Sequence, residues 1–445
     1  MISIITTMTT RTTTMNKYIK KVKVLSLMTI LTLLTQVTFA ANIDTDRTWY
    51  LSGESMNLSV TTDDALIAYA ELCDTHSLVA SSIIRLHDGK GTGTMELPSD
   101  LHSGYYVLSV YTRDNANVSR RLVAVVNPLQ KNVDDDIEWV QIADADSLSY
   151  PCTREGEYIS SANFIDEKEM DIRETEGHIV KAHIRNVYNG STFAAKQIVS
   201  SLSIVGKQIH YFEGKMVNDS TAVFFAHGVH GKQPLILSAA SNTGVSLPIE
   251  MISPFAALIP KSLPLLVFHY RRSEVEQRSR DMQLHQFSIT PAKRELQIGE
   301  KDDADMEDGV PMDYDPVIFG KKPNLTYDLN EYRQFLTIRE VLIEYVSRVK
   351  REKIKGVNQL VLHGEDIGYE SWPAMVFIDG MPVIDIDRLL NYDARRIRYI
   401  NIYEHQYTFG NGVYKGILSL VSRSGRLTNY PTEPNTQYVV YEFPE

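Results

Sequence analysis

Short runs of alternating apolar and polar residues, separated by turn signals, constrain the fold of this 445-residue chain more than any other feature. Between residues 42 and 128, the runs at 56–60, 68–72 and 122–126 alternate in this way. A period of two places one face of a strand on a core and the opposite face in water. Because turn signals such as Ser52-Gly53 separate the runs, the sequence predicts a β-sandwich over residues 42–128.

A second stretch, residues 166–255, repeats this pattern. Strand candidates lie at 180–184 and 198–205, and Asn189-Gly190 predicts a hairpin because both residues tolerate positive φ. The chain length allows about three domains. The net charge of −11 offers no basic excess for phosphate backbones, so we predict no nucleic-acid partner.

Acidic residues interrupt the pattern twice. We interpret residues 129–165 as an acidic linker; calcium binding is the alternative, since hard cations prefer oxygen ligands, but no complete ligand loop with its glycine is present. We interpret residues 256–322 as a connecting segment. It contains a strand candidate at 262–269 and a second acidic cluster at 302–309.

The C-terminal part of the chain begins with the clearest helix pattern. Thr337 and Glu340 fit a capping box, in which each side chain satisfies a free backbone N–H group. Apolar residues follow at helical spacing, namely Ile338, Val341, Leu342, Tyr345, Val346 and Val349.

Strand candidates then follow this helix, at 375–378, 397–403 and 417–421. A helix with flanking strands predicts an α+β unit over residues 323–425, followed by a C-terminal tail over 426–445. The predicted fold class is therefore mainly β, with two Ig-like sandwiches followed by a small α+β unit.

The N-terminus has the features of an export signal. Basic residues precede an apolar run at 24–34, which is shorter than the roughly 20 apolar residues of a spanning helix. Cleavage between Ala40 and Ala41 would remove residues 1–40 as a signal peptide, and Met15 is an alternative start. We expect an exported protein of the periplasm or the outer membrane, with no transmembrane segment in the mature chain.

Residues 47–126 contain an aromatic-x-x-Gly-Glu start, a Gly-x-Gly turn and a Ser-Gly-Tyr-Tyr strand. In these motifs the segment resembles the second macroglobulin-type domain (MG2) of α2-macroglobulin-like proteins. The residues that carry the motifs are Gly53, Glu54, Gly104, Tyr105 and Tyr106. We expect the glycines to lie where the chain reverses between strands, at positions 89, 91, 93 and 104.

Two cysteines occur, Cys73 and Cys152. Neither lies in the Gly-Cys-Gly-Glu-Gln segment with which thioester macroglobulins trap proteases, so covalent trapping is not predicted. An exported location permits a Cys73–Cys152 disulfide, but we favour two unpaired thiols because the sequence gives no geometry for the bridge.

Residues 373–423 contain a strand that ends Ile-Asp-Gly-x-Pro and a Gly-(five residues)-Gly-Ile close. They resemble the plug domain of TonB-dependent outer-membrane receptors. The residues that carry this likeness are Asp379, Gly380, Pro382, Gly410 and Gly416.

The combination of the two resemblances is similar to Bacteroidota-type envelope proteins that join macroglobulin-like domains to a plug-like domain. It implies a Gram-negative cell envelope. Only residues 424–445 follow the plug-like stretch, so we expect that this unit does not occlude a pore made by its own chain.

Signals for catalysis or cofactor binding are weak. His227 and His230 are a possible metal pair, but glycine-flanked histidines at a strand end are more often turn residues. No phosphate-cradling loop, dinucleotide fingerprint or serine nucleophile elbow is present. The 56 acidic residues leave a glycosidase pair open, because no two of them are marked as partners across a cleft.

The predicted function is therefore that of a non-enzymatic interaction or scaffold module in the envelope. It needs no cofactor and no metal, it has an envelope protein as its partner, and its oligomeric state is left open. Two alternatives remain: an accessory component of a TonB-dependent transport system, and a periplasmic hydrolase.

Overall fold

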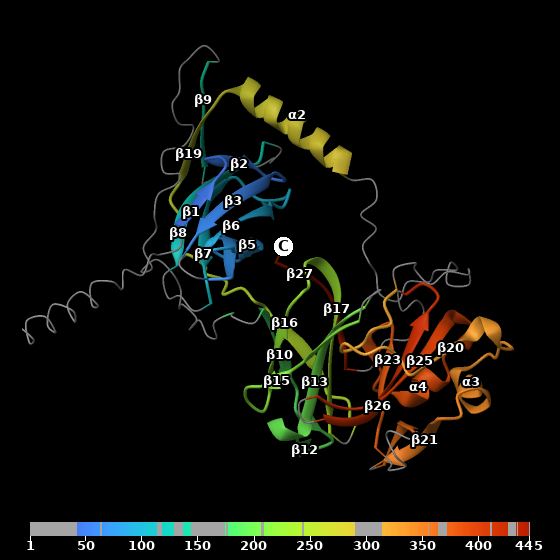
Figure 1. Cartoon of the computed structure of the whole chain (residues 1–445). Helices are drawn as coiled ribbons and strands as arrows, with labels where there is room; N and C mark the ends of the chain where they lie inside the picture. Colours follow the sequence, from blue (N-terminus) through green and yellow to red (C-terminus); the bar gives the residue numbers. More distant parts are fainter. Residues whose placement is uncertain are drawn as a thin grey trace, which may run out of the picture.

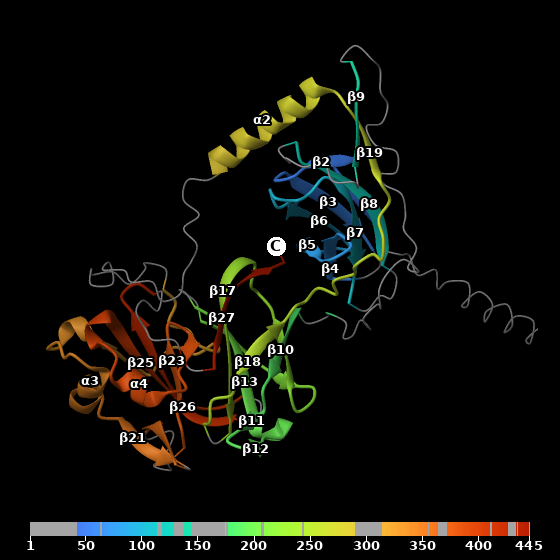
Figure 2. The same ribbon diagram turned by 180° about the vertical axis from the view of Figure 1, so that it is seen from behind.

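The computed structural model describes residues 42–62, 65–113, 118–128, 137–143, 174, 177–205, 209–242, 244–289, 314–354, 356–363, 372–409, 412–425, 433 and 435–444. The chain is mainly β, as predicted: two β-sandwiches and an α+β unit. Figures 1 and 2 show the second sandwich lying between the first sandwich and the α+β unit.

The first sandwich packs a three-stranded sheet on a five-stranded sheet. The smaller sheet has the order β1 (Asn42–Thr45), β3 (Ser55–Thr61), β6 (Lys90–Glu96). The larger sheet has the order β2 (Trp49–Leu51), β8 (Ser119–Val126), β7 (Gly104–Tyr111), β4 (Ile67–Cys73), β5 (Leu78–Arg85). Met56, Leu58 and Val60 of β3 are buried between the sheets while their neighbours along the strand are more exposed, which confirms the alternation read from the sequence.

The larger sheet is buried on both faces, which the sequence did not predict. Every residue of β4 is buried, because a second apolar layer covers the outer face of the sheet. That layer consists of β9 (Ile137–Gln141) and β19 (Leu266–Tyr270), which pair in parallel, and α2 (Arg272–Ile289) (Figure 1).

Two predicted connections are therefore corrected. The acidic linker over 129–165 contains the strand β9, and the connecting segment over 256–322 contains the 18-residue helix α2 as well as the expected strand at 262–269. The partner of β9 lies far along the chain, so no local pattern reveals the pairing.

The second sandwich consists of two sheets with four strands each. One has the order β15 (Lys215–Met216), β16 (Thr221–Ala226), β10 (His178–Ile184), β18 (Ile249–Ile252). The other has the order β14 (His210–Glu213), β13 (Ile198–Ile204), β17 (Gly231–Ser241), β27 (Gln437–Phe443). The predicted Asn189-Gly190 hairpin is present between β11 (Val187–Tyr188) and β12 (Ser191–Thr192), and both turn residues have positive φ. A 3₁₀ turn, η2 (Ala195–Gln197), leads into β13.

The last strand of the chain belongs to the second sandwich. β27 pairs with β17 in antiparallel register, from Gly231 opposite Phe443 to Leu237 opposite Gln437. Tyr441 and Phe443 are buried in the core of this sandwich. The prediction of a C-terminal tail over 426–445 is therefore wrong for residues 437–443, and the α+β unit is an insertion between β18 and β27.

The α+β unit is built on a five-stranded sheet. Its order is β20 (Leu325–Asp328), β25 (Ile397–Phe409), β26 (Gly412–Ser422), β23 (Met375–Ile378), β24 (Met381–Pro382), with β23 and β26 parallel. Beside it lie the hairpin of β21 (Val349–Ile354) and β22 (Val357–Leu362), the helices α3 (Ile338–Glu344) and α4 (Ile386–Leu390), and the 3₁₀ turns η4 (Leu329–Glu331) and η5 (Ala394–Arg396). They enclose one apolar core with the sheet.

The predicted helix is present but shorter than its apolar stripe. The Thr337–Glu340 capping box forms as expected at the start of α3. The helix ends at Glu344, and Val349, the last residue of the stripe, begins β21 instead. Val346 and Val349 are nevertheless buried in the core of the unit. The apolar spacing therefore predicted the burial of these residues correctly but the length of the helix incorrectly.

Candidate binding site between the second sandwich and the α+β unit

Glu54 of the MG2-like motif anchors helix α2. Its buried carboxylate accepts hydrogen bonds from Leu51 N at 2.7 Å and from Arg278 Nη2 at 2.6 Å. The Arg278 guanidinium also lies 3.7 Å from the centre of the Trp49 ring, a cation–π contact. Gly53 takes a φ of 86° in the turn before Glu54. This motif therefore holds the outer layer on the first sandwich.

The other MG2-like motif residues are packing residues. Tyr105 faces the outer layer formed by β9, β19 and α2. Tyr106 faces the core between the two sheets and donates from Oη to His102 O at 2.8 Å. Gly104 is the first residue of β7, and a Cβ at this position would meet no heavy atom within 4 Å, so it does not mark a forced reversal.

The expectation for the neighbouring glycines is also corrected. Gly89 has a φ of 72° in the turn after β5, as expected. Gly91 and Gly93 instead lie inside β6, where a Cβ would approach Arg85 O to 2.2 Å and Ile84 Cγ1 to 2.6 Å. They are glycines because β5 and β6 approach closely at this corner of the sandwich.

Asp379 and Gly380 of the plug-like motif form the turn between β23 and β24, with φ of 47° and 86°. The buried Asp379 carboxylate accepts from Ser422 N at 2.7 Å and from Ser422 Oγ. A Cβ on Gly380 would lie 3.3 Å from Ile204 O, so this turn packs directly against the end of β13. It is a contact between the α+β unit and the second sandwich.

The remaining motif residues lie on the same sheet. Pro382 is on the short edge strand β24, where a missing N–H is tolerated. Gly416, with a φ of 87°, stands alone opposite Glu404 and His405 in a β-bulge of the β25–β26 pair. Gly410 lies outside the described residues.

A buried polar cluster joins the two sandwiches to the C-terminal strand. The Glu174 carboxylate accepts from Tyr69 Oη at 2.7 Å and lies 3.2 Å from His178 Nδ1. His178 Nε2 is 2.6 Å from Tyr441 Oη on β27, and Arg113 Nε is 3.7 Å from Glu174. The first sandwich, the second sandwich and β27 thus share one network.

Burial sets the ionisation of this cluster. Removal of His178 from water lowers its pKa below the usual value, and this outweighs the opposing effect of Glu174. Burial also opposes ionisation of Glu174, but the hydrogen bond from His178 and the charge of Arg113 lower the Glu174 pKa overall. The cluster therefore holds a carboxylate–guanidinium pair beside a neutral imidazole.

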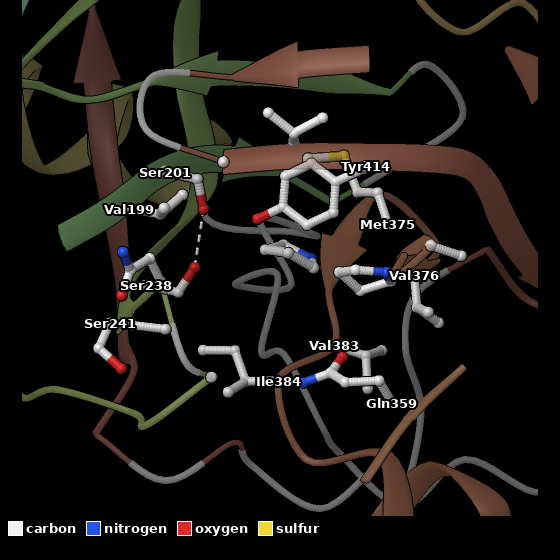
Figure 3. A pocket seen from close by; sticks show the side chains of 18 of the residues that line it. Val199, Ser201, Ser238, Ser241, Gln359, Met375, Val376, Val383, Ile384 and Tyr414 are labelled. Atoms are coloured by element: carbon white, nitrogen blue, oxygen red, sulfur yellow. Dashed lines mark hydrogen bonds between the residues drawn. The ribbon is translucent and has the colours of Figure 1, made fainter. Parts of the chain in front are cut away.

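The cavity that stands out lies between the second sandwich and the α+β unit and has a volume of about 410 Å³. One wall is the outer face of β13 and β17, where Val199 lies opposite Ala240 and Ser201 opposite Ser238. The opposite wall comes from the α+β unit and includes Gln359, Val376, Val383 and Ile384, as Figure 3 shows.

Small side chains on the β13–β17 wall create this space. The residues that point to the other side of the same strands, such as Leu202 and Leu237, are large and fill the sandwich core. Serines, alanine and valine on the outer face leave room that the α+β unit does not fill. The Ser201 and Ser238 hydroxyls are 2.8 Å apart and hydrogen-bonded (Figure 3).

The cavity is lined by uncharged groups. Its polar side chains are hydroxyls and amides, contributed by Ser201, Tyr211, Ser238, Ser241, Asn242, Gln359 and Tyr414. None of the described lining residues is Asp, Glu, His, Lys, Arg or Cys. Burial raises the pKa of Tyr414 to about 12 and raises that of Tyr211 as well, so both phenols are neutral at physiological pH.

The sequence motifs did not locate this cavity. Of the ten motif residues named above, Pro382 alone lines it among those the structure describes. The available signal was the alternation along 198–204 and 231–241, with small residues on one side of each strand. Small residues on a strand face indicate a cavity only when the unit that packs against that face is known. The sequence alone did not predict that the α+β unit packs there.

The other candidate groups do not form a site in the described part of the chain. There, no three His, Cys, Asp or Glu side chains converge as metal ligands would. His230 Nδ1 lies 3.2 Å from Pro444 O, and His227 packs its ring on Phe212. Cys73 is a buried free thiol whose pKa burial raises to about 12, and Cys152 lies outside the described residues. No described helix combines the length and the apolar character needed to cross a bilayer.

Together these features define a mainly β protein of two sandwiches with an inserted α+β unit and an uncharged cavity at the junction. Neither a protein-family model nor a curated protein matches the chain. Among solved structures, it is similar to Escherichia coli α2-macroglobulin in its native conformation, with 13% identity and a TM-score of 0.18, over 50% of this chain and 15% of that one.

Two further structures show similarities of the same order. The BSP domain of a biofilm-associated protein has 11% identity and a TM-score of 0.17, over 51% of this chain and 30% of that one. Salmonella α2-macroglobulin reacted with methylamine has 10% identity and a TM-score of 0.17, over 50% and 15%. The chain thus spans less than a third of each of these proteins, and at these scores the similarities assign it to no family.

Proposed function

We propose that this protein is a non-enzymatic binding and scaffold module of the Gram-negative cell envelope. In this proposal residues 1–40 direct export, and the mature chain works in the periplasm or at the outer membrane. The cavity between the second sandwich and the α+β unit is the binding site.

The uncharged lining of the cavity carries this proposal. General acid–base and nucleophilic catalysis need positioned groups that gain or lose protons near neutral pH, such as His, carboxylates or activated nucleophiles. The described lining offers serines, tyrosines and amides without a neighbouring base among them. A concave site of several hundred Å³ with a few convergent polar groups is suited to binding.

The construction of the site supports the scaffold part of the proposal. Its two walls belong to different units, which the Asp379–Gly380 turn and the β27–β17 pairing tie together. The plug-like motif sequence favours a partner in an outer-membrane transport system as the finer form of this proposal.

Site-specific cross-linking in the native bacterium tests the proposal. A photo-crosslinking amino acid replaces Trp372, which lines the cavity and is 42% exposed. In a control strain it replaces Tyr188 of the β11–β12 hairpin, which does not line the cavity and is 45% exposed. We expect the tagged protein in the envelope fraction and an adduct with an envelope component from position 372 alone. Residence in the cytoplasm, or the same adducts from both positions, contradicts the proposal.

A further inference from the structure

Nearly all polar side chains of the cavity can both donate and accept hydrogen bonds. A serine or tyrosine hydroxyl both donates and accepts hydrogen bonds, and the amides of Asn242 and Gln359 also carry both functions. The Ser201–Ser238 bond uses only part of the capacity of those two hydroxyls. A ligand whose own groups both donate and accept is therefore matched at many orientations.

A charged ligand does not match this cavity. A carboxylate or phosphate that left water would meet no Lys, Arg or His among the described lining residues. Burial of an ionised group without a counter-charge is costly. The lining thus selects neutral molecules.

A purely apolar ligand does not match it either. Such a ligand would offer no hydrogen bond to the amide of Gln359, nor to the Ser238 hydroxyl, whose bond to Ser201 uses only part of its capacity. Yet apolar surfaces are also present, since Val199, Val383 and Ile384 line the same space (Figure 3). The aromatic rings of Trp372 and Tyr414 add flat faces. The ligand must carry hydroxyl groups around an apolar ring face.

We propose that the cavity binds a neutral saccharide unit of one or two rings. A sugar ring has hydroxyls at its edge, which match the serine and amide groups, and C–H faces, which match the aromatic and aliphatic walls. The volume of about 410 Å³ lies within the range of small-molecule sites. This inference rests on the proposed binding function and names the ligand class for the same site.

Calorimetric titration of the full-length mature protein tests the inference. The ligands are glucose, galactose, N-acetylglucosamine, maltose, cellobiose and chitobiose, with glucuronic acid as the charged comparison. We expect at least one neutral sugar to bind and glucuronic acid not to bind.

Variants connect that binding to the cavity. Gln359→Ala removes an amide from one wall and Ser238→Ala a hydroxyl from the other, and each should weaken binding about tenfold, the loss expected for one hydrogen bond in a buried site. The matched control is Gln233→Ala, which removes a half-buried glutamine of β17 that donates to His230 O at 2.8 Å outside the cavity lining. It should leave the affinity unchanged.

Two results overturn the inference. One is the absence of binding by every neutral sugar of the panel; the other is binding that both cavity variants leave unchanged in a folded protein. If position 372 still forms its envelope adduct in either case, the proposed binding function stands and the saccharide assignment alone fails. If that adduct is absent as well, both fail.

Discussion

Glu71 of β4 is a fully buried carboxylate whose partners are backbone groups of a distant segment. It accepts from Ala256 N at 2.6 Å, Ala257 N at 3.2 Å and Leu258 N at 2.9 Å, and also from Tyr111 Oη. Ala257 has a φ of 55°, which costs energy for a residue with a Cβ. Glu71 therefore holds in place the strained crossover from the second sandwich to β19.

The substitution Glu71→Gln should destabilise the protein by about 2–4 kcal/mol, because the amide end of Gln turns a donor toward N–H groups that need an acceptor. Chemical denaturation gives the free energy of unfolding. Glu442→Gln is the control: Glu442 is 64% exposed and lies 3.9 Å from Lys232, so its loss should cost no more than about 0.5 kcal/mol. Equal costs for the two variants would contradict the role given to Glu71.

Two glycines in strands allow a second comparison of single residues. Gly416→Ala would place a Cβ 2.3 Å from Leu362 Cδ1 and 3.1 Å from Tyr403 O at a φ of 87°, so we expect a loss of about 2 kcal/mol or more. Gly104→Ala meets nothing within 4 Å and should be neutral or stabilise by about 0.5 kcal/mol. Thermal or denaturant unfolding distinguishes them, and a harmless Gly416→Ala would rule out the tight bulge.

Among the elements, β27 shows most clearly where local sequence information ends. The alternation along 56–60 predicted β3 and its buried face, because both depend on residues close in sequence. The segment that forms β27 was interpreted as a tail, since its partner β17 lies roughly 200 positions earlier and only the pairing makes it a core strand. Strand β9 was missed for the same reason. Helix α2 was missed because it lacks the apolar stripe by which α3 was found.

Opposite faces of β27 provide a matched test of its place in the fold. Phe443 is 1% exposed in the core of the second sandwich, whereas Val440 on the other face is 54% exposed. We expect Phe443→Ala to cost about 3–5 kcal/mol and Val440→Ala less than about 0.5 kcal/mol in the free energy of unfolding. Similar small losses for both would show that residues 437–443 are not part of the core.

For the molecule as a whole, the cluster around His178 couples three segments and makes their association sensitive to pH. Because burial lowers the His178 pKa in the folded state, the unfolded chain takes up a proton first as the pH falls below about 6.5. The folded state thus keeps its full stability above that pH. The free energy of unfolding decreases as the pH falls from there to the lowered pKa of His178. The groups that face His178 are Glu174, Arg113, Tyr69 and Tyr441.

The stability of the native protein should therefore fall between pH 7 and pH 5.5, by at most about 1.4 kcal/mol per pH unit from this one residue. His178→Gln should be less stable at pH 7 but should lose less on acidification. His76→Gln, at an exposed position, should keep the native pH dependence. Denaturant titrations at the two pH values measure both differences, and an unchanged slope for His178→Gln would exclude this residue as the origin.

The candidate site also belongs to the scale of the whole molecule, which explains why the sequence did not reveal it. Asp379, Gly380 and Gly416 stand out in the sequence because a turn pair and a glycine are local signals, and in the structure all three have positive φ. The cavity instead depends on the docking of Gln359 and Val383 against the small residues of β13 and β17. That docking follows from the insertion, and no local pattern encodes it.

The return of β27 to the second sandwich has a consequence for synthesis. The hydrogen-bonding edge of β17 is produced early, but the strand that covers it is made roughly 200 residues later. A truncated product would expose an open strand edge, which invites aggregation and proteolysis. Synthesis of residues 437–443 is thus a condition for closing the second sandwich, so fragments that stop before β27 would be the first to be degraded.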